Sequence, residues 1–301
     1  MAYVLLTLTT LFWAGNFVLG RAMHNVLPPV TMAELRWSSA LLIILPFLLP
    51  KLKANWRIII PHWKVLIPLG ILSVGSFNTF IYIGLTTTGA TNATLLQSAI
   101  PIIILIISGF FLKEVVSFRQ WVGVACSLCG VLTLISLGQP SQLLNLDINQ
   151  GDLWILAAVL CWATYSICLR WRPADLDGFT FFGVTVIVGV IALLPFSLLE
   201  LQTAAPIIWK PAAFASILYM AVFPSILAHL FWNRGVAELG AAKAGLFIHL
   251  MPLFGMLLST IFLGEGVQAY HLTGMVLIFI GIYLAVITNV MKRIPKLDRG
   301  S

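Results

Sequence analysis

The chain has 301 residues, of which 60% are hydrophobic and only 9% are charged, and its mean hydropathy is +1.03. Charged residues make up about a quarter of a typical soluble domain, so this composition excludes a water-soluble globular protein. The formal net charge of +7 comes from basic residues in short loops between apolar segments. That distribution indicates orientation in a membrane rather than binding to nucleic acid.

The first apolar segment begins almost at the first residue. It follows Met1 and Ala2 without the basic stretch and the small-residue cleavage site of a secretory signal peptide. We therefore expect this segment to remain in the membrane as a permanent span.

Ten segments are apolar enough and long enough to cross a bilayer, which requires about 20 mostly apolar residues. Unpaired backbone groups are too costly in hydrocarbon, so each segment is predicted to be a helix. Short loops separate them, including one expected at residues 51–62. In chain order the segments cover residues 3–21, 30–50, 63–85, 91–112, 118–138, 150–170, 178–199, 211–232, 241–263 and 271–291.

The basic residues are divided unequally between the two sides of this arrangement. With ten spans both termini lie on one side, and the other side holds only Arg21 and Lys210, while Arg36 lies within a span and is not counted. The positive-inside rule therefore predicts that both termini are cytoplasmic. The basic residues on the side of the termini are Lys51, Lys53, Arg57, Lys64, Lys113, Arg119, Arg170, Arg172, Arg234, Lys243, Lys292, Arg293, Lys296 and Arg299.

The sequence also contains an internal repeat. A shift of 151 positions lays residues 84–130 onto 235–281, and a shift of 149 near the start pairs Trp13 with Trp162 and Arg21 with Arg170. Chance similarity between two leucine-rich stretches does not align glycines, prolines and glutamates in order. The aligned pairs include Gly84/Gly235, Gly89/Gly240, Pro101/Pro252, Glu114/Glu265, Gly123/Gly274 and Gly130/Gly281.

The repeat divides the chain into two halves and a tail. Residues 1–142 and 143–291 each hold five predicted spans, and residues 292–301 form a basic tail expected to lie in the cytoplasm. Because five is odd, the second half enters the membrane from the opposite side to the first. Inverted repeats of this kind recur in secondary transporters, where they surround a central cavity. We predict an all-α integral membrane protein of ten transmembrane helices built in this way.

Two duplicated motifs resemble the drug/metabolite transporter superfamily, in particular its EamA-type members. These are the pairs Trp13-Ala14 and Trp162-Ala163, together with Phe111-Leu112-Lys113-Glu114 and Phe262-Leu263-Gly264-Glu265. The resemblance extends to about residue 291, and the overall pattern is most similar to bacterial amino-acid exporters of the YddG type. It implies transport of amino acids or other metabolites out of the cytoplasm, across an inner membrane. Branches that carry phosphorylated substrates use intramembrane Lys or Arg, and the absence of a mid-membrane Lys disfavours such a substrate.

Polar and aromatic residues inside spans are the candidates for substrate binding, because such groups are costly in the membrane. Trp13 and Asn16 lie three positions apart on one helix face, and their repeat equivalents are Trp162 and Tyr165. The repeat equivalent of Asn16 is thus not an amide.

The third, fourth and ninth segments supply further candidates. Asn78 and Tyr82 lie four positions apart, Gln97 and Ser98 precede Pro101, and His249 precedes Pro252 in the other half. These residues are expected to line a cavity between the halves. Amide, phenol and indole groups suit a neutral or zwitterionic solute, whose carboxylate they can bind and whose ammonium can lie over an aromatic ring.

Other polar residues have simpler structural interpretations. His229 and Asn233 lie near the predicted cytoplasmic end of their span, where a bond between helices is the more common role. Glu34 and Arg36 are expected to pair within the second helix or at the interface. Glu114 and Glu265 are expected to be structural.

The sequence therefore predicts a secondary transporter, either an exporter or a facilitator, for small organic solutes. Neutral or aromatic amino acids are the expected substrates, and the protein is expected to be able to act as a monomer in the lipid bilayer. The alternatives are a multidrug or other metabolite exporter of the same fold and a channel-like pore. No span carries a central carboxylate for ion coupling, which favours a facilitator.

An enzyme is not expected. The five histidines are scattered, and the sequence has no nucleophile–base pair, metal-ligand cluster or Walker motif. The four cysteines lie in apolar segments, where packing is their usual role. Neither a cofactor nor a metal is predicted.

Overall fold

The computed structural model describes residues 1–113, 116–145, 149–204, 207, 209–263 and 268–286. In these ranges the regular elements are all helices, which confirms the all-helical prediction. Two of the short elements, η2 and η5, are π-helical turns, and the other η elements are 3-10 turns. The elements are α1 (Ala2–Met23), α2 (Pro29–Ile59), η1 (Ile60–His62), α3 (Trp63–Gly70), η2 (Ile71–Phe77), α4 (Asn78–Thr87), α5 (Ala90–Gln97), α6 (Ile100–Phe110), α7 (Phe118–Ile135), η3 (Pro140–Asn145), α8 (Gln150–Cys168), η4 (Leu169–Trp171), α9 (Gly178–Thr203), α10 (Pro211–Met220), η5 (Ala221–Leu227), α11 (Ala228–Leu239), α12 (Ala241–Gly245), η6 (Leu246–His249), α13 (Leu250–Leu263) and α14 (Ala269–Val286).

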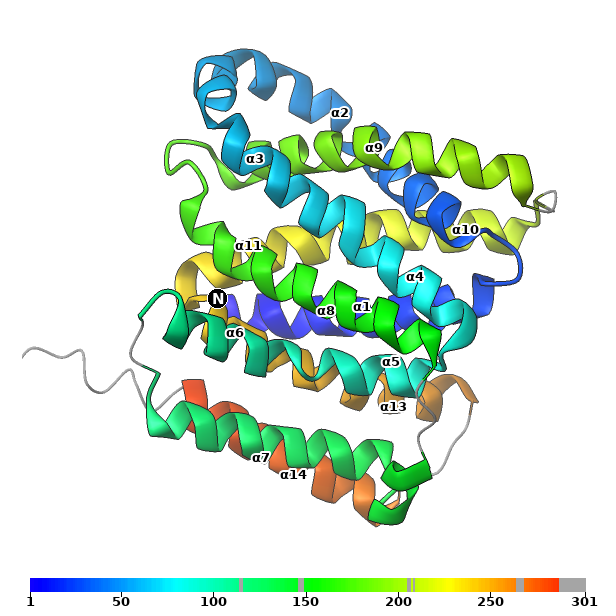
Figure 1. Ribbon diagram of the computed structural model, residues 1–301, viewed down its shortest axis with the longest axis vertical. Coiled ribbons are helices and arrows are strands. Elements are labelled where there is room, and N and C mark those ends of the chain that lie inside the picture. The colour runs from blue at the N-terminus through cyan, green and yellow to red at the C-terminus, as the bar shows by residue number, and fades with distance from the viewer. Residues whose placement is uncertain (114–115, 146–148, 205–206, 208, 264–267, 287–301) are drawn as a thin grey trace, which may run out of the picture.

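The helices lie roughly side by side in one bundle (Figure 1). The pair α7 and α14 forms one edge, and α2 packs against α9 at the opposite edge. Between these edges α1 packs against α11, and α4 packs against α8. Elements from both halves of the sequence therefore alternate through the centre of the bundle.

The outside of the bundle is apolar, and polar side chains lie within it. Phe47 is 70% exposed and Phe110 is 82% exposed, whereas Asn16, Arg36 and His229 are buried. Such a surface is stable against lipid hydrocarbon and not against water. The chain is thus a multi-pass membrane protein.

Eight helical stretches of the described residues are long and apolar enough to span a membrane, and Ala269–Ala285 is a shorter apolar helix. One of the eight runs for 59 residues, from Pro29 to Thr87. That length far exceeds one crossing, and α4 packs back against α2. The chain therefore reverses its direction near η1.

The predicted loop at residues 51–62 is wrong, because α2 continues to Ile59 and η1 follows it directly. Lys and Arg are good helix formers, so charges in this stretch do not end the helix. The amide of Asn55 donates to the carbonyl of Lys51, and Trp56 is 60% exposed. Charge ends the apolar part of a span without ending the helix itself.

Several segments that are predicted as single α-helices contain irregular turns in the structure. The turn η2 separates α3 from α4, and its counterpart η5 separates α10 from α11. The helix also breaks between Gln97 and Ile100, just before Pro101, which cannot donate a backbone hydrogen bond. Glu114, Glu265 and the tail at residues 292–301 lie outside the described residues.

Glycines allow α7 and α14 to approach closely. A Cβ atom at Gly130 would lie 2.6 Å from the carbonyl oxygen of Gly274, and one at Gly123 would lie 2.6 Å from that of Gly281. The backbones of α7 and α14 are thus in contact at two positions along the pair, and neither position has room for a side chain. Small residues at such crossings are the usual means of tight helix packing in membranes.

We expect Gly130→Val to reduce the free energy of unfolding in detergent by about 1–3 kcal/mol, because the valine side chain overpacks the contact with α14. Cys129→Val is the matched control, since Cys129 is the neighbouring residue and is exposed. Denaturation of both purified variants measures the difference. Equal stability of the two variants would contradict the close contact.

Candidate functional site

A polar centre forms where α1, α2, α4 and η5 meet. It contains Asn16, Arg36, Asn78, Tyr82 and Ser225, all of which are buried, and Arg36 has no exposed surface. Arg36 lies about two turns into α2, well inside the apolar part of the bundle. Asn78 and Tyr82 lie one turn apart on α4 and thus present their polar groups on one side of that helix.

The guanidinium of Arg36 organises this centre. Its Nη1 donates to Asn78 Oδ1 at 2.8 Å, Tyr82 OH at 2.8 Å and Asn16 Oδ1 at 3.1 Å. Its Nε donates to Ser225 Oγ at 2.5 Å. The Tyr82 hydroxyl in turn donates to Asn16 Oδ1 at 2.8 Å, so two helices hold the arginine through shared partners.

The π-helical turn η5 prepares the contact with Ser225. In this turn the Ser225 hydroxyl donates to the carbonyl of Met220, five positions earlier, at 2.7 Å. Its lone pairs remain available to Arg36. Single π-helical turns are often found at functional sites, because they displace side chains from the regular helical register.

The partners of Arg36 are electrically neutral, and its Nη2 has no hydrogen-bond partner. A buried cation without a carboxylate is costly, particularly inside a membrane. The centre thus has an excess of positive charge and of donors.

The predicted pairing of Glu34 with Arg36 is wrong. Residues two apart on a helix do not face each other, and Glu34 instead accepts a hydrogen bond from Ser38 Oγ at 2.7 Å. The second carboxylate oxygen of Glu34 has no partner. Arg36 is therefore a candidate site residue that the sequence interpretation missed, although its position inside an apolar span is a signal for it.

An aromatic cluster adjoins the polar centre. Trp13 and Trp162, the predicted repeat pair, lie with ring centroids 4.9 Å apart, and Trp232 lies 5.2 Å from Trp13. His229 lies 5.2 Å from Trp162 and 4.9 Å from Trp37, whose ring is 5.0 Å from the Arg36 guanidinium. His229 is therefore part of this cluster, where its ring contacts rings of other helices.

Backbone and side-chain bonds fix the cluster in place. Trp13 Nε1 donates to the carbonyl of Pro224 at 3.2 Å, directly beside Ser225. Trp232 Nε1 donates to Ser166 Oγ at 3.2 Å, and Tyr165 OH donates to Asn233 Oδ1 at 2.6 Å. The indole N–H of Trp162 is buried and has no partner.

The remaining predicted residues form a separate set of contacts. His249 Nε2 lies 3.0 Å from the carbonyl of Ser98, and its Nδ1 lies 2.6 Å from Ser127 Oγ. Because a carbonyl only accepts, the proton belongs on Nε2. Gln97, beside Ser98, is buried with its amide nitrogen unpartnered. The structure therefore places Gln97, Ser98 and His249 close together, and none of the three is among the hydrogen-bond partners of Arg36.

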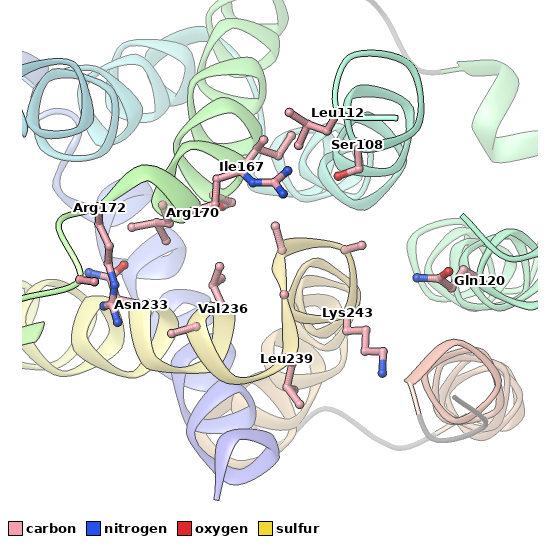
Figure 2. A pocket seen from close by; sticks show the side chains of 17 residues that line it. Ser108, Leu112, Gln120, Ile167, Arg170, Arg172, Asn233, Val236, Leu239 and Lys243 are labelled. Carbon is pink, nitrogen blue, oxygen red and sulfur yellow. The ribbon is translucent and has the colours of Figure 1, made fainter. Parts of the chain in front are cut away.

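A cavity of about 590 Å³ opens at one end of the bundle, between the ends of α6, α8 and α11 and the start of α12 (Figure 2). Among the described residues that line it, Arg170, Arg172 and Lys243 are basic and none is acidic. Ser166 and Asn233 also line it, so the cavity extends to residues that bond the aromatic cluster.

The end of the bundle away from this cavity is held by several hydrogen bonds. The Glu200 carboxylate, near the end of α9, accepts from the backbone of Val30 at 3.1 Å and of Thr31 at 2.7 Å. Thr88 Oγ1 lies 2.6 Å from Asn149 Oδ1 and 2.9 Å from Asp152 Oδ1. These bonds join α9 to α2 and α4 to α8.

Within the described ranges, no group of three or more His, Cys, Asp or Glu residues is arranged to bind a metal ion.

Comparison with known proteins gives one consistent family. The EamA-like transporter family matches residues 1–136 and 149–287. "Uncharacterized transporter YyaM" of Bacillus subtilis is 29% identical over 98% of this chain and 95% of its own length. "Protein PecM" of Dickeya dadantii is 28% identical over 72% of this chain and 71% of its own length. A solved structure titled "Crystal structure of protein" shares the fold, with a TM-score of 0.72 at 17% identity over 97% of this chain and 98% of that chain.

We expect Tyr82→Phe to reduce the free energy of unfolding by about 1–3 kcal/mol, because it removes a hydroxyl that pairs with a buried charge. Tyr283→Phe, on α14, is the matched control, since Tyr283 is 54% exposed. Denaturation in detergent compares the two variants. An effect of Tyr82→Phe no larger than that of the control would contradict the Arg36 network.

Proposed function

Because the chain belongs to the EamA-like transporter family, and is a membrane transporter rather than an enzyme, we propose that it moves small organic solutes by alternating access. In this proposal ten membrane crossings form two inverted halves, and the solute binds between them. The observation that carries the proposal is a cavity that opens at one end of the bundle and leads toward buried polar and aromatic side chains.

Glycine contacts support the inverted repeat. A Cβ atom at Gly84 would meet the side chain of Ile155, and one at Gly235 would meet that of Leu6. Gly235 is the repeat equivalent of Gly84 at the shift of 151, and Ile155 is that of Leu6 at the shift of 149. The same contact thus occurs twice, with the roles of the two halves exchanged.

Differences between equivalent positions support alternating access. Arg21 Nη1 donates to the carbonyl of Leu85 at 2.6 Å, joining α1 to α4. The repeat equivalents, Arg170 and Val236, both line the cavity. A carrier open to one side requires that equivalent positions of two similar halves have different surroundings, and exchanging these surroundings would open the other side.

The proposed orientation places the cavity on the cytoplasmic side of an inner membrane. Arg170, Arg172 and Lys243 belong to the basic side of the predicted topology, which the positive-inside rule assigns to the cytoplasm. Both termini then lie in the cytoplasm as well.

Amino acids remain the proposed substrates, and Trp13, Asn16, Asn78, Tyr82, Gln97, Ser98, Trp162, Tyr165 and His249 remain the proposed binding residues. The similarity to YddG-type exporters stays a prediction. The nearness of Trp13 and Trp162 to the polar centre supports a solute that has both an aromatic or apolar part and a polar part.

Cysteine labelling tests the inversion. Lys53 near the end of α2 and Gln202 near the end of α9 are equivalent at the shift of 149, and both are exposed. In a chain without its native cysteines, we expect an impermeant maleimide to label Gln202→Cys in intact cells and Lys53→Cys only after permeabilisation. Labelling of both positions from the same side would contradict the inverted halves.

Counterflow in proteoliposomes tests transport. With phenylalanine and leucine as labelled solutes, we expect saturable exchange. Trp13→Ala is expected to weaken the apparent affinity about fivefold, since a lost aromatic contact is worth about 1 kcal/mol. Trp56→Ala is the matched control, because Trp56 is 60% exposed on the outside of α2. Equal exchange rates for the two variants would contradict a role of Trp13 in binding the solute.

A further inference from the structure

The buried polar atoms without partners are mostly donors. Of the described residues, eight side-chain nitrogen or oxygen atoms are buried and unpartnered, and six of these are N–H groups of Arg, Asn, Gln or Trp. Buried donors are normally satisfied, so an excess of one kind indicates a missing acceptor. The six groups belong to Arg36, Trp37, Asn78, Gln97, Trp162 and Asn233.

Two of these donors meet at the polar centre. Asn78 Oδ1 accepts from Arg36 Nη1 at 2.8 Å, which assigns the oxygen of this amide and leaves its nitrogen as the unpartnered donor. Arg36 Nη2 is unpartnered on the same guanidinium. An acceptor carrying negative charge would satisfy both groups and compensate the charge of Arg36.

Apolar surface lies directly beside these donors. The Trp37 ring is 5.0 Å from the Arg36 guanidinium and 4.9 Å from the His229 ring, and the Trp162 ring follows at 5.2 Å. A ligand that presents an anionic group to Arg36 therefore has aromatic surfaces for its remaining atoms.

The cavity that leads toward the polar centre is positively charged, as Arg36 is. Among the described residues that line the cavity, Arg172 and Lys243 are basic and none is acidic, and Figure 2 shows these two on different sides of it. Like charges in a confined opening raise the local concentration of anions. At its inner end Ser166 accepts from Trp232, whose ring lies 5.5 Å from that of Trp162, so aromatic rings separate the cavity from Arg36.

From these observations we propose that the polar centre binds the carboxylate of an organic monocarboxylate, with Arg36 Nη2 and the Asn78 amide as donors and the tryptophan cluster around the apolar body. The proposal rests on the transporter function above and names its substrate class. One guanidinium among neutral partners compensates a single negative charge, which favours a carboxylate over a phosphate dianion. The aromatic rings between the cavity and Arg36 must part to admit the ligand.

Binding to the purified full-length chain tests this assignment. Its thermal melting is measured in detergent with phenylacetate, phenylacetamide, phenethylamine or inorganic phosphate. We expect only phenylacetate to raise the Tm saturably, with an apparent affinity at least about tenfold tighter than that of the isosteric amide, since charge-assisted hydrogen bonds are lost with the amide. A similar shift with the amide, the amine or phosphate, or no shift with phenylacetate, overturns the proposal.

Variants identify the responsible residue. Arg36→Gln is expected to abolish the phenylacetate shift, and Arg57→Gln to keep it, because Arg57 is exposed near the end of α2. Should Arg36→Gln fail to fold, Ser225→Ala keeps the arginine and loses its Nε contact. It is expected to weaken binding several-fold, and an unchanged shift in the variant that folds overturns the role of Arg36.

Counterflow separates this proposal from the transport function. If wild-type vesicles exchange phenylacetamide as well as phenylacetate, the protein is a transporter and the carboxylate site is wrong. If no solute exchanges while phenylacetate still stabilises the protein through Arg36, the carboxylate site stands and the transport proposal is wrong.

Discussion

A positive charge buried inside a membrane bundle constrains everything near it. Arg36 has no exposed surface, and side chains from three other elements converge on it. Because every partner is neutral, the hydrogen bonds disperse the charge without cancelling it. The helices α1 and α4 and the π-helical turn η5 each place a side-chain oxygen within hydrogen-bond distance of this guanidinium. Changes in these elements are therefore coupled through the guanidinium.

The aromatic cluster connects this centre to the cavity. Trp37 contacts both Arg36 and His229, and Trp232 is bonded to Ser166 on the cavity wall. Trp13 belongs to the first half of the chain, and Trp162 and Trp232 belong to the second. Relative movement of the halves would therefore alter the contacts among these rings. In the proposed transport cycle, these ring contacts would couple binding at the polar centre to opening at the end of the bundle without a separate gating element.

The sequence predicts much of this arrangement because its signals are local. Apolar length predicts helices, and the spacing of Asn78 and Tyr82 predicts that they share a helix face, as they do beside Asn16. The role of Arg36 depends on tertiary contacts that local spacing does not specify, although a separation of two positions already argued against a pair with Glu34. The π-helical turns and the helical continuation through residues 51–59 have no simple sequence pattern, and for that reason the sequence predicts neither these turns nor the end of α2.

The proposed carboxylate site requires that the buried donors around Arg36 take their missing acceptor from the substrate. A crystal structure of the protein with bromophenylacetate tests this most directly, because bromine locates the ligand by its anomalous scattering. We expect the carboxylate within hydrogen-bond distance of Arg36 Nη2 and the bromine beside the tryptophan rings. Bromine confined to the cavity near Lys243, with Arg36 bonded as it is here, would contradict it.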